Sequence, residues 1–302
     1  MKTKNIKYLF LFLFAIYACA NAQTNYFNKT STVLGARSAA LAEAFVSDAF
    51  DVNGMYWNMA GLTKLRNYSI LFNHMQEKSI NGMSQGIAIP ISLKTGEVMA
   101  IGLSLIHTGY IRKNSPTEFK LWQLCSDVGY AREILHSLSI GTLVGVRFAK
   151  SDVSQLWSVR TSVSANYSPA ENISYGLVLN SIGNGIDYSI DKGTTQLNRI
   201  TLAHSLQAGI TMKFPSDMKN QLFSFALANE KIFGKAGLRY KGGLEMNVTN
   251  FLVLRGGYIV ENNLRFATIG VGIQTKIFSI DYSIFPQKVT NQEMYLSIAL
   301  NL

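Results

Sequence analysis

The sequence predicts an all-β protein, a transmembrane antiparallel β-barrel of about fourteen strands with a short helical plug near its N-terminus. Three observations predict this fold. Apolar residues alternate with small or polar ones at a period of two through most of the chain, which is typical of strands. The 302 residues are 48% hydrophobic but only 15% charged, whereas an ordinary soluble protein has about 25% charged residues. After residue 22, no apolar run reaches the roughly 18 residues of a membrane helix.

Residues 1–22 have the layout of a secretory signal peptide. Three lysines precede an apolar run from Tyr8 to Ala18, and small residues precede a cleavage site after Ala22. The run is shorter than the ~20 residues that a membrane anchor needs, and the bulky residues before Cys19 disfavour a lipoprotein. Loss of this segment would lower the net charge from +10 to +7 and leave Cys125 as the one cysteine, with no intrachain disulfide.

Residues 23–66 do not alternate, and we expect them to form a compact plug inside the barrel. The Ala-rich run 35–46 favours a short helix. The spacing D-x-x-D-x-N that follows lacks the further ligands and the terminal glutamate of a calcium loop. We therefore expect no metal, and expect the polar groups to hydrogen-bond within the lumen. The plug residues singled out are Gly35, Arg37, Asp48, Asp51, Asn53, Trp57, Asn58 and Gly61.

The barrel itself is predicted over residues 67–302. Strands are expected at 67–76, 82–93, 97–108, 118–132, 137–150, 153–168, 171–182, 198–214, 220–230, 235–248, 251–260, 264–275, 277–286 and 292–302. Their number is even, as in single-chain bacterial barrels, and the longer links 110–117 and 183–198 are expected to be extracellular loops. A large secreted β-sandwich also alternates, but strands of ~10 or more residues and a Gly- and Ser-rich polar face favour the barrel.

Several charged residues fall on the polar face of the predicted strands. The basic ones are Arg147, Arg160, Lys235, Arg239, Lys241 and Arg255, and the acidic ones are Glu245 and Asp281. One interpretation is a cationic lumen that holds an anionic ligand, such as a fatty-acid carboxylate. The favoured interpretation is that these charges pair with Glu43, Asp48 and Asp51 of the plug and close the pore.

Segments along the whole mature chain resemble a known family. They are GARSAALAEAFVSDAFDVNGMYWNMAGL at 35–62, YSPAENISYGL at 167–177 followed by NSIG at 180–183, and GGLE at 242–245 with LRGGY at 254–258. In order and spacing they resemble the PorV/PorQ family of Bacteroidota outer-membrane barrels, and more widely the FadL-type long-chain fatty-acid transporters. One departure is Met59, which stands where the family usually has proline.

The resemblance implies a fourteen-stranded FadL-like barrel in the outer membrane of a Gram-negative bacterium, with its N-terminal segment inside. PorV-like members bind the C-terminal signal domains of cargo of the type IX secretion system, and PorQ-like members belong to its attachment complex. The implied partners are therefore type IX components or cargo C-terminal domains, besides outer-membrane lipid and lipopolysaccharide.

No pattern of catalytic chemistry appears in the sequence. The four histidines have no metal-ligand spacing, and there is no phosphate-binding loop and no G-x-S-x-G elbow. We expect a non-enzymatic protein without cofactor, and scattered basic residues argue against nucleic-acid binding. The first hypothesis is a PorV/PorQ-type protein that binds secretion cargo or partners at the cell surface. The alternatives are a FadL-like channel for hydrophobic small molecules and a purely structural barrel.

Overall fold

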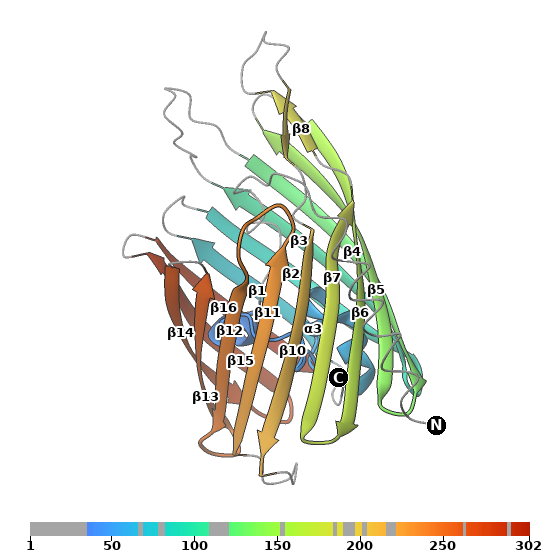
Figure 1. Ribbon diagram of the computed structural model, residues 1–302, viewed down its shortest axis with the longest axis vertical. Coiled ribbons are helices and arrows are strands. Elements are labelled where there is room, and N and C mark those ends of the chain that lie inside the picture. Colours follow the sequence, from blue (N-terminus) through green and yellow to red (C-terminus); the bar gives the residue numbers. More distant parts are fainter. Residues whose placement is uncertain are drawn as a thin grey trace.

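The two-faced strands join into one closed antiparallel barrel of fourteen strands, which confirms the predicted fold (Figure 1). This computed structural model describes residues 35–65, 69–77, 82–108, 121–151, 155–183, 186–189, 197–200, 204–215, 222–261, 264–288 and 291–302. The expected signal peptide and the link 110–117 lie outside the described residues. Strands that follow one another along the wall are neighbours, and the first pairs with the last to close the sheet.

The wall consists of β1 (Ser69–Glu77), β2 (Gly82–Lys94), β3 (Glu97–Thr108), β4 (Leu121–Leu135), β5 (Leu138–Ser151), β6 (Gln155–Ala170), β7 (Ile173–Gly183), β10 (Ser205–Phe214), β11 (Phe223–Ile232), β12 (Arg239–Asn247), β13 (Leu252–Glu261), β14 (Leu264–Gln274), β15 (Phe278–Lys288) and β16 (Asn291–Asn301). Two further strands, β8 (Ile186–Ser189) and β9 (Leu197–Ile200), form a separate hairpin. Inside the barrel lie two short α-helices, α2 (Ala36–Ala40) and α3 (Gly54–Trp57), and the 3₁₀ helix η2 (Met59–Lys64).

The two ends of the barrel differ in their connections. At one end, which we call the short-turn rim, pairs of strands join through two residues, as at 95–96, 136–137 and 171–172. At the opposite end, the long-loop rim, β3 connects to β4 and β7 connects to β10 through longer segments. The hairpin β8–β9 belongs to the second of these and extends beyond the wall (Figure 1).

The sequence prediction was wrong at two connections. The expected strand 198–214 is two elements, because residues 197–200 pair with β8 while Ser205 is the first residue of β10 to pair with β7. The link 183–198 therefore contains a strand of its own. Lys235 was expected on the polar face of a strand, but it lies in the turn between β11 and β12, because β12 begins only at Arg239.

Alternate residues of each wall strand face opposite environments. In β5, Val144 and Val146 point outward and are 46% and 41% exposed, whereas Ser139 and Arg147 point inward and are buried. The exposed face of the barrel is correspondingly apolar along most strands, as a wall in contact with lipid requires. Within the described residues, no helix has the length and apolarity needed to cross a membrane.

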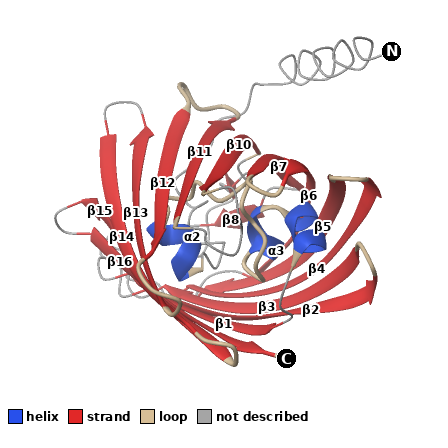
Figure 2. Cartoon of the chain, turned by 90° about the horizontal axis from the view of Figure 1, so that it is seen from below, coloured by secondary structure: helices blue, strands red, loops and turns tan. Residues whose placement is uncertain are grey.

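The segment 35–65, which we call the plug, lies within the ring of strands (Figure 2). Its first helix is shorter than the Ala-rich run predicts, since α2 ends at Ala40. Ala42 and Glu43 follow with φ angles of 54° and 63°, which turn the chain sharply. Such left-handed backbone is costly for residues other than glycine, so the surrounding wall must hold it in place.

The plug fits because glycines line the inner wall where its backbone passes. A methyl group added at Gly141 would lie 2.5 Å from the amide nitrogen of Ala60, and one added at Gly257 would lie 2.5 Å from that of Ala42. The buried apolar side chains of the plug, Phe45, Met55, Met59 and Leu62 among them, fill the space between these contacts. The hydrophobic core of this protein thus lies between plug and wall.

The outward side chains of the wall face lipid, so the free-energy cost of a charged residue there should depend on its depth in the membrane. We expect Val144→Arg, in the middle of β5, to lower the free energy of unfolding by about 2–4 kcal/mol, because arginine would then lie in the hydrocarbon. The matched control is Leu135→Arg, an exposed position at the last residue of β4, where the cost should be about 0–1 kcal/mol. Urea unfolding from phospholipid vesicles measures both, and equal costs would contradict a lipid-facing wall.

Two adjacent glycines of β13 test the fit of the plug. Gly257 faces Ala42, whereas a methyl group at Gly256 would have its nearest neighbour at 3.8 Å. We expect Gly257→Ala to destabilise the protein by about 1–3 kcal/mol through overpacking, and Gly256→Ala to change stability by less than about 0.5 kcal/mol. Thermal unfolding in detergent compares the two. A similar loss in both variants would show that the plug does not press on the wall here.

Candidate functional site

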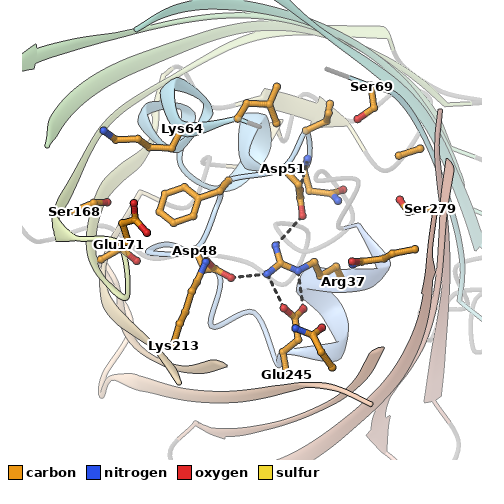
Figure 3. A pocket seen from close by; sticks show the side chains of 18 of the residues that line it. Arg37, Asp48, Asp51, Lys64, Ser69, Ser168, Glu171, Lys213, Glu245 and Ser279 are labelled. Carbon is orange, nitrogen blue, oxygen red and sulfur yellow. Dashed lines mark hydrogen bonds and ion pairs between the residues drawn. The ribbon is translucent and has the colours of Figure 1, made fainter. Parts of the chain in front are cut away.

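The guanidinium of Arg37, at the start of α2, is the centre of an ion network that joins the plug to the wall (Figure 3). Its Nε donates to Glu245 Oε2 of β12 at 2.8 Å, its Nη1 donates to Asp51 Oδ2 at 2.9 Å, and its Nη2 donates to Asp48 Oδ2. Arg37 thus binds two carboxylates of its own segment and one of the barrel. Plug and wall are connected through charge-assisted hydrogen bonds, which are the strong ones.

The network continues into the wall. Arg255 Nε of β13 donates to Glu245 Oε2 at 2.6 Å, and Arg255 Nη1 donates to Asp281 Oδ1 of β15 at 2.6 Å. On the other side, Lys213 Nζ of β10 lies 2.8 Å from Asp48 Oδ1. Six residues singled out in the sequence therefore form one network of alternating charges across the lumen, which Lys213 extends: Arg37, Asp48, Asp51, Glu245, Arg255 and Asp281.

Burial would by itself lower the pKa of Arg37, but Glu245, Asp48 and Asp51 outweigh it and hold that pKa well above the ordinary value. The guanidinium of Arg37 therefore carries its positive charge at neutral pH. Removal of one partner from such a buried set is costly, since the remaining charges stay desolvated.

A second ion cluster forms beside the turn that follows α2. Glu43 Oε2 lies 3.1 Å from Lys241 Nζ and 3.3 Å from Arg239 Nη1, and Glu230 Oε2 lies 2.8 Å from both nitrogens. Gln207 adds a hydrogen bond to Glu230 at 3.0 Å. These contacts hold Glu43 in its left-handed conformation and provide a second attachment of the plug to the wall.

Two other plug residues singled out in the sequence, Asn58 and Trp57, make contacts that hold the plug together and against the wall. The amide of Asn58 binds the carbonyls of Val46 and Ala165 at 2.7 and 3.1 Å, and its Oδ1 accepts from the amide of Ala60, at the start of η2. The ring of Trp57 packs edge-on against the ring of Phe45. Lys241 Nζ lies 5.7 Å from the centroid of the Trp57 ring.

Gly35 and Gly61 are positions of close approach. A methyl group at Gly35 would meet the side-chain amide of Asn53, and one at Gly61 would lie 2.4 Å from the carbonyl oxygen of Ala49. Asn53 in turn accepts a hydrogen bond from Asn73 of β1. Met59, at the position that departs from the family motif, is buried where a Cβ at Gly129 would otherwise stand.

The last two candidates, Arg147 and Arg160, lie apart from these networks. Arg160 Nε and Nη2 of β6 both lie 3.0 Å from Asp127 Oδ1 of β4. Arg147 of β5 is buried, and within the described part of the chain no ion pair with it is present. Gly145 of β5 leaves the space that the Asp127 carboxylate occupies.

Three charged residues that were not singled out in the sequence are buried and face inward: Lys213, Asp127 and Glu230. For Lys213 and Glu230, the parity of β10 and β11 would have placed them on the inner face. With the carboxylates of Asp127 and Glu230 included, the charge of the interior is closer to balance than the residues singled out in the sequence implied. Asp48 and Asp51, whose spacing first invited a calcium site, serve instead as partners of Arg37 and Lys213.

A polar cavity of about 700 Å³ lies between the plug and the short-turn rim. Its lining includes Arg37, Asp51, Lys64, Lys213 and Glu171. Within this cavity, the carboxylates of Asp48, Asp51 and Glu245 point toward the guanidinium of Arg37 (Figure 3). The network is thus reached from the short-turn rim.

The chain matches no family model and no curated protein. Among solved structures it is similar to the toluene transporter TodX of Pseudomonas putida, at 12% identity and a TM-score of 0.63, over 93% of this chain and 97% of that one. The toluene transporter TbuX of Ralstonia pickettii gives 12% identity and a TM-score of 0.62, over 88% and 97%. A Pseudomonas aeruginosa FadL homologue gives 11% and 0.53, over 93% and 99%. The fold is that of FadL-like outer-membrane barrels.

The Arg37 network predicts a large effect of a single substitution. We expect Arg37→Met to lower the free energy of unfolding by about 3–5 kcal/mol, because Asp48, Asp51 and Glu245 lose a shared buried cation. The control is Lys64→Met, since Lys64 and its partner Glu133 are 31% and 27% exposed and such pairs contribute about 0–1 kcal/mol. Urea unfolding in detergent gives both values; a loss for Arg37→Met no larger than the control would rule out the network as the main anchor.

Proposed function

We propose that this chain is an outer-membrane channel for hydrophobic small molecules, in which the plug must shift for a molecule to pass. The observation that carries the proposal is a closed barrel whose lumen holds a plug that adds no strand to the wall. Since the hydrogen-bond ladder closes through β1 and β16 without the plug, the plug can move without opening the sheet. The similarity to TodX and TbuX, both described as toluene transporters, supports the same function.

The proposed channel has a defined direction in the membrane. Barrels of this class carry short turns on the periplasmic side and longer loops outside, so we place the short-turn rim in the periplasm. The Arg37 cavity then faces the periplasm, and the hairpin β8–β9 faces the exterior. The basic, apolar and small-residue order of residues 1–22 suits export to that membrane, and the apolar outer wall suits contact with outer-membrane lipid and lipopolysaccharide.

A second candidate is docking of secreted protein in the manner of the PorV/PorQ family. The plug motif and the two hairpin motifs of the sequence favour it. Native co-purification from the outer membrane separates the two functions, because docking predicts recovery of type IX components or cargo C-terminal domains after cross-linking. Recovery of neither, together with uptake of a hydrophobic probe, would leave the channel.

A reversible tether tests whether the plug has to move. The hydroxyls of Ser47 and Thr211 lie 2.8 Å apart, so Ser47→Cys with Thr211→Cys in a Cys125→Ala background should form a plug-to-wall disulfide. In a Gram-negative host without a related channel, we expect the oxidised variant to lose uptake of labelled toluene at least about tenfold. Reduction of the same protein should restore uptake.

The reduced form and the single Ser47→Cys variant are the controls for this experiment. Equal uptake in the oxidised and reduced forms would show that no plug movement is required. Uptake no higher than in the host without the protein, for every variant, would overturn the channel itself.

A further inference from the structure

Two polar side chains, His74 of β1 and Gln85 of β2, stand on the outer, lipid-facing side of the wall. In β1, Asn73 is buried on the inner face, so His74 shares the outer face with the exposed Phe72. In β2, Ser84 is buried and Gln85 is exposed. His74 and Gln85 are direct partners in the ladder, so two polar groups meet at one point of an apolar surface.

A row of ladder partners places this pair near the middle of the membrane. The strands of a closed barrel are tilted, so a row of direct partners on the outer face passes from one rim to the other. This row starts at the third residue of β6, at the long-loop rim, and ends at the first residue of β11, at the short-turn rim. Its members in order are Trp157, Phe148, Leu124, Leu105, Gln85, His74, Leu296, Tyr282, Val271, Leu254, Met246 and Phe223. Gln85 and His74 are the fifth and sixth of these twelve residues, and all the others are aromatic or aliphatic.

Neither side chain has a hydrogen-bond partner within the part of the chain that the structure describes. Hydrocarbon offers none, and an unpaired polar group there is costly. A bond between the two side chains would still leave the second ring nitrogen of His74 and part of the Gln85 carboxamide without a partner. By contrast, the exposed Thr142 of β5 donates to the carbonyl of Ser162 in the next strand. His74 and Gln85 therefore require a partner from outside the chain.

The surface around the pair can receive another protein. A hollow of about 440 Å³ lies beside His74 and Gln85. Its apolar lining comes from β1–β4 and β16 and includes Phe72, Ile87, Leu103, Leu105, Leu124 and Leu296. Interfaces within a membrane are held by close packing and by hydrogen bonds between polar side chains, and this surface offers both.

We propose that the outer face around His74 and Gln85 joins two copies of this chain into a dimer, with a two-fold axis along the membrane normal. All copies enter the membrane in one orientation, so a second copy carries the same two polar groups at the same depth. A two-fold interface is self-complementary, and it brings each imidazole opposite Gln85 of the partner subunit. The interface lies outside the lumen and does not depend on the proposed channel.

The hydrogen bonds of such a dimer balance. Each neutral imidazole donates from one nitrogen to the carboxamide oxygen of Gln85 of the partner subunit, and accepts at the other nitrogen from its own Gln85. The four side chains then form a closed ring of four hydrogen bonds. Each ring nitrogen has a partner, and so have the oxygen and the nitrogen of each carboxamide.

The test measures dimerisation of the purified protein in phospholipid vesicles, by energy transfer between labelled copies as the ratio of lipid to protein is raised. We expect His74→Leu and Gln85→Leu each to weaken the dimer by about five- to tenfold, since both contacts between the copies are lost. The double variant should be no weaker than either single variant, because all three lack the same two contacts. The control is Thr142→Val, which should leave the dimer unchanged.

Cross-linking in the native outer membrane identifies the occupant of this face. In a Cys125→Ala background, oxidation of Phe72→Cys should give a disulfide-linked dimer at least about tenfold faster than oxidation of Ile269→Cys, since Ile269 of β14 is 65% exposed but lies far from the pair along the wall. A cross-link of Phe72→Cys to a different membrane protein, without linked dimer, would overturn the second copy as the occupant.

A stability measurement guards against a trivial loss of fold. His74→Leu and Gln85→Leu place apolar groups in hydrocarbon, so their midpoints of thermal unfolding at high lipid ratios should equal or exceed that of the wild type. Equal dimerisation of the wild type and both variants, or a wild type that stays monomeric at every lipid ratio, would overturn the proposal. A failed toluene uptake assay would overturn the channel and leave this interface standing.

Discussion

A wall that faces lipid has to pair every backbone amide and carbonyl within itself, and this requirement determines the rest of the molecule. The sheet meets it by closing, with β1 and β16 in register over nine residues from Ser69–Asn301 to Glu77–Glu293. Closure fixes an interior of definite width. Fourteen strands enclose more space than their own small inward side chains fill, so a second piece of chain has to occupy it.

The plug fills this interior and contacts the wall in two ways. Glycines of the wall let its backbone approach closely, and ion networks around Arg37 and Glu43 connect its charges to β10–β13. The two kinds of contact contribute differently to the stability of the seated plug. Close backbone packing supplies shape and apolar burial, while the buried charges demand particular partners and so select one seating of the plug. All of these contacts leave the hydrogen-bond ladder of the wall complete without the plug.

The sequence predicted the wall well because each strand carries its own evidence. Alternation is local, and in segments such as 138–148 or 157–167 it identifies the strand, its two faces and the direction of Arg147 and Arg160. It could not predict which charges meet. The partners Arg37 and Glu245 are 208 residues apart, and their contact depends on how the plug folds back. The sharp turn at Ala42 and Glu43 was hidden for the same reason, since the Ala-rich run favours a helix and only the wall enforces the turn. The hairpin β8–β9 was missed because residues 197–200 have a partner outside the barrel.

Because inward and outward positions alternate along a strand, the face on which a side chain lies depends on how many residues precede it in that strand. Gly256 and Gly257 are identical residues, yet one borders lipid and the other admits the plug, so their roles depend only on whether their position is odd or even. Deletion of one residue within β13 would exchange the two sets, placing Arg255 toward hydrocarbon and Leu254 among the buried charges. We therefore expect single-residue insertions and deletions to be tolerated best in the connections, or where the register already shifts, as between Thr161 and Val163 of β6. In the evolution of such a chain, length should change at the rims or by whole hairpins.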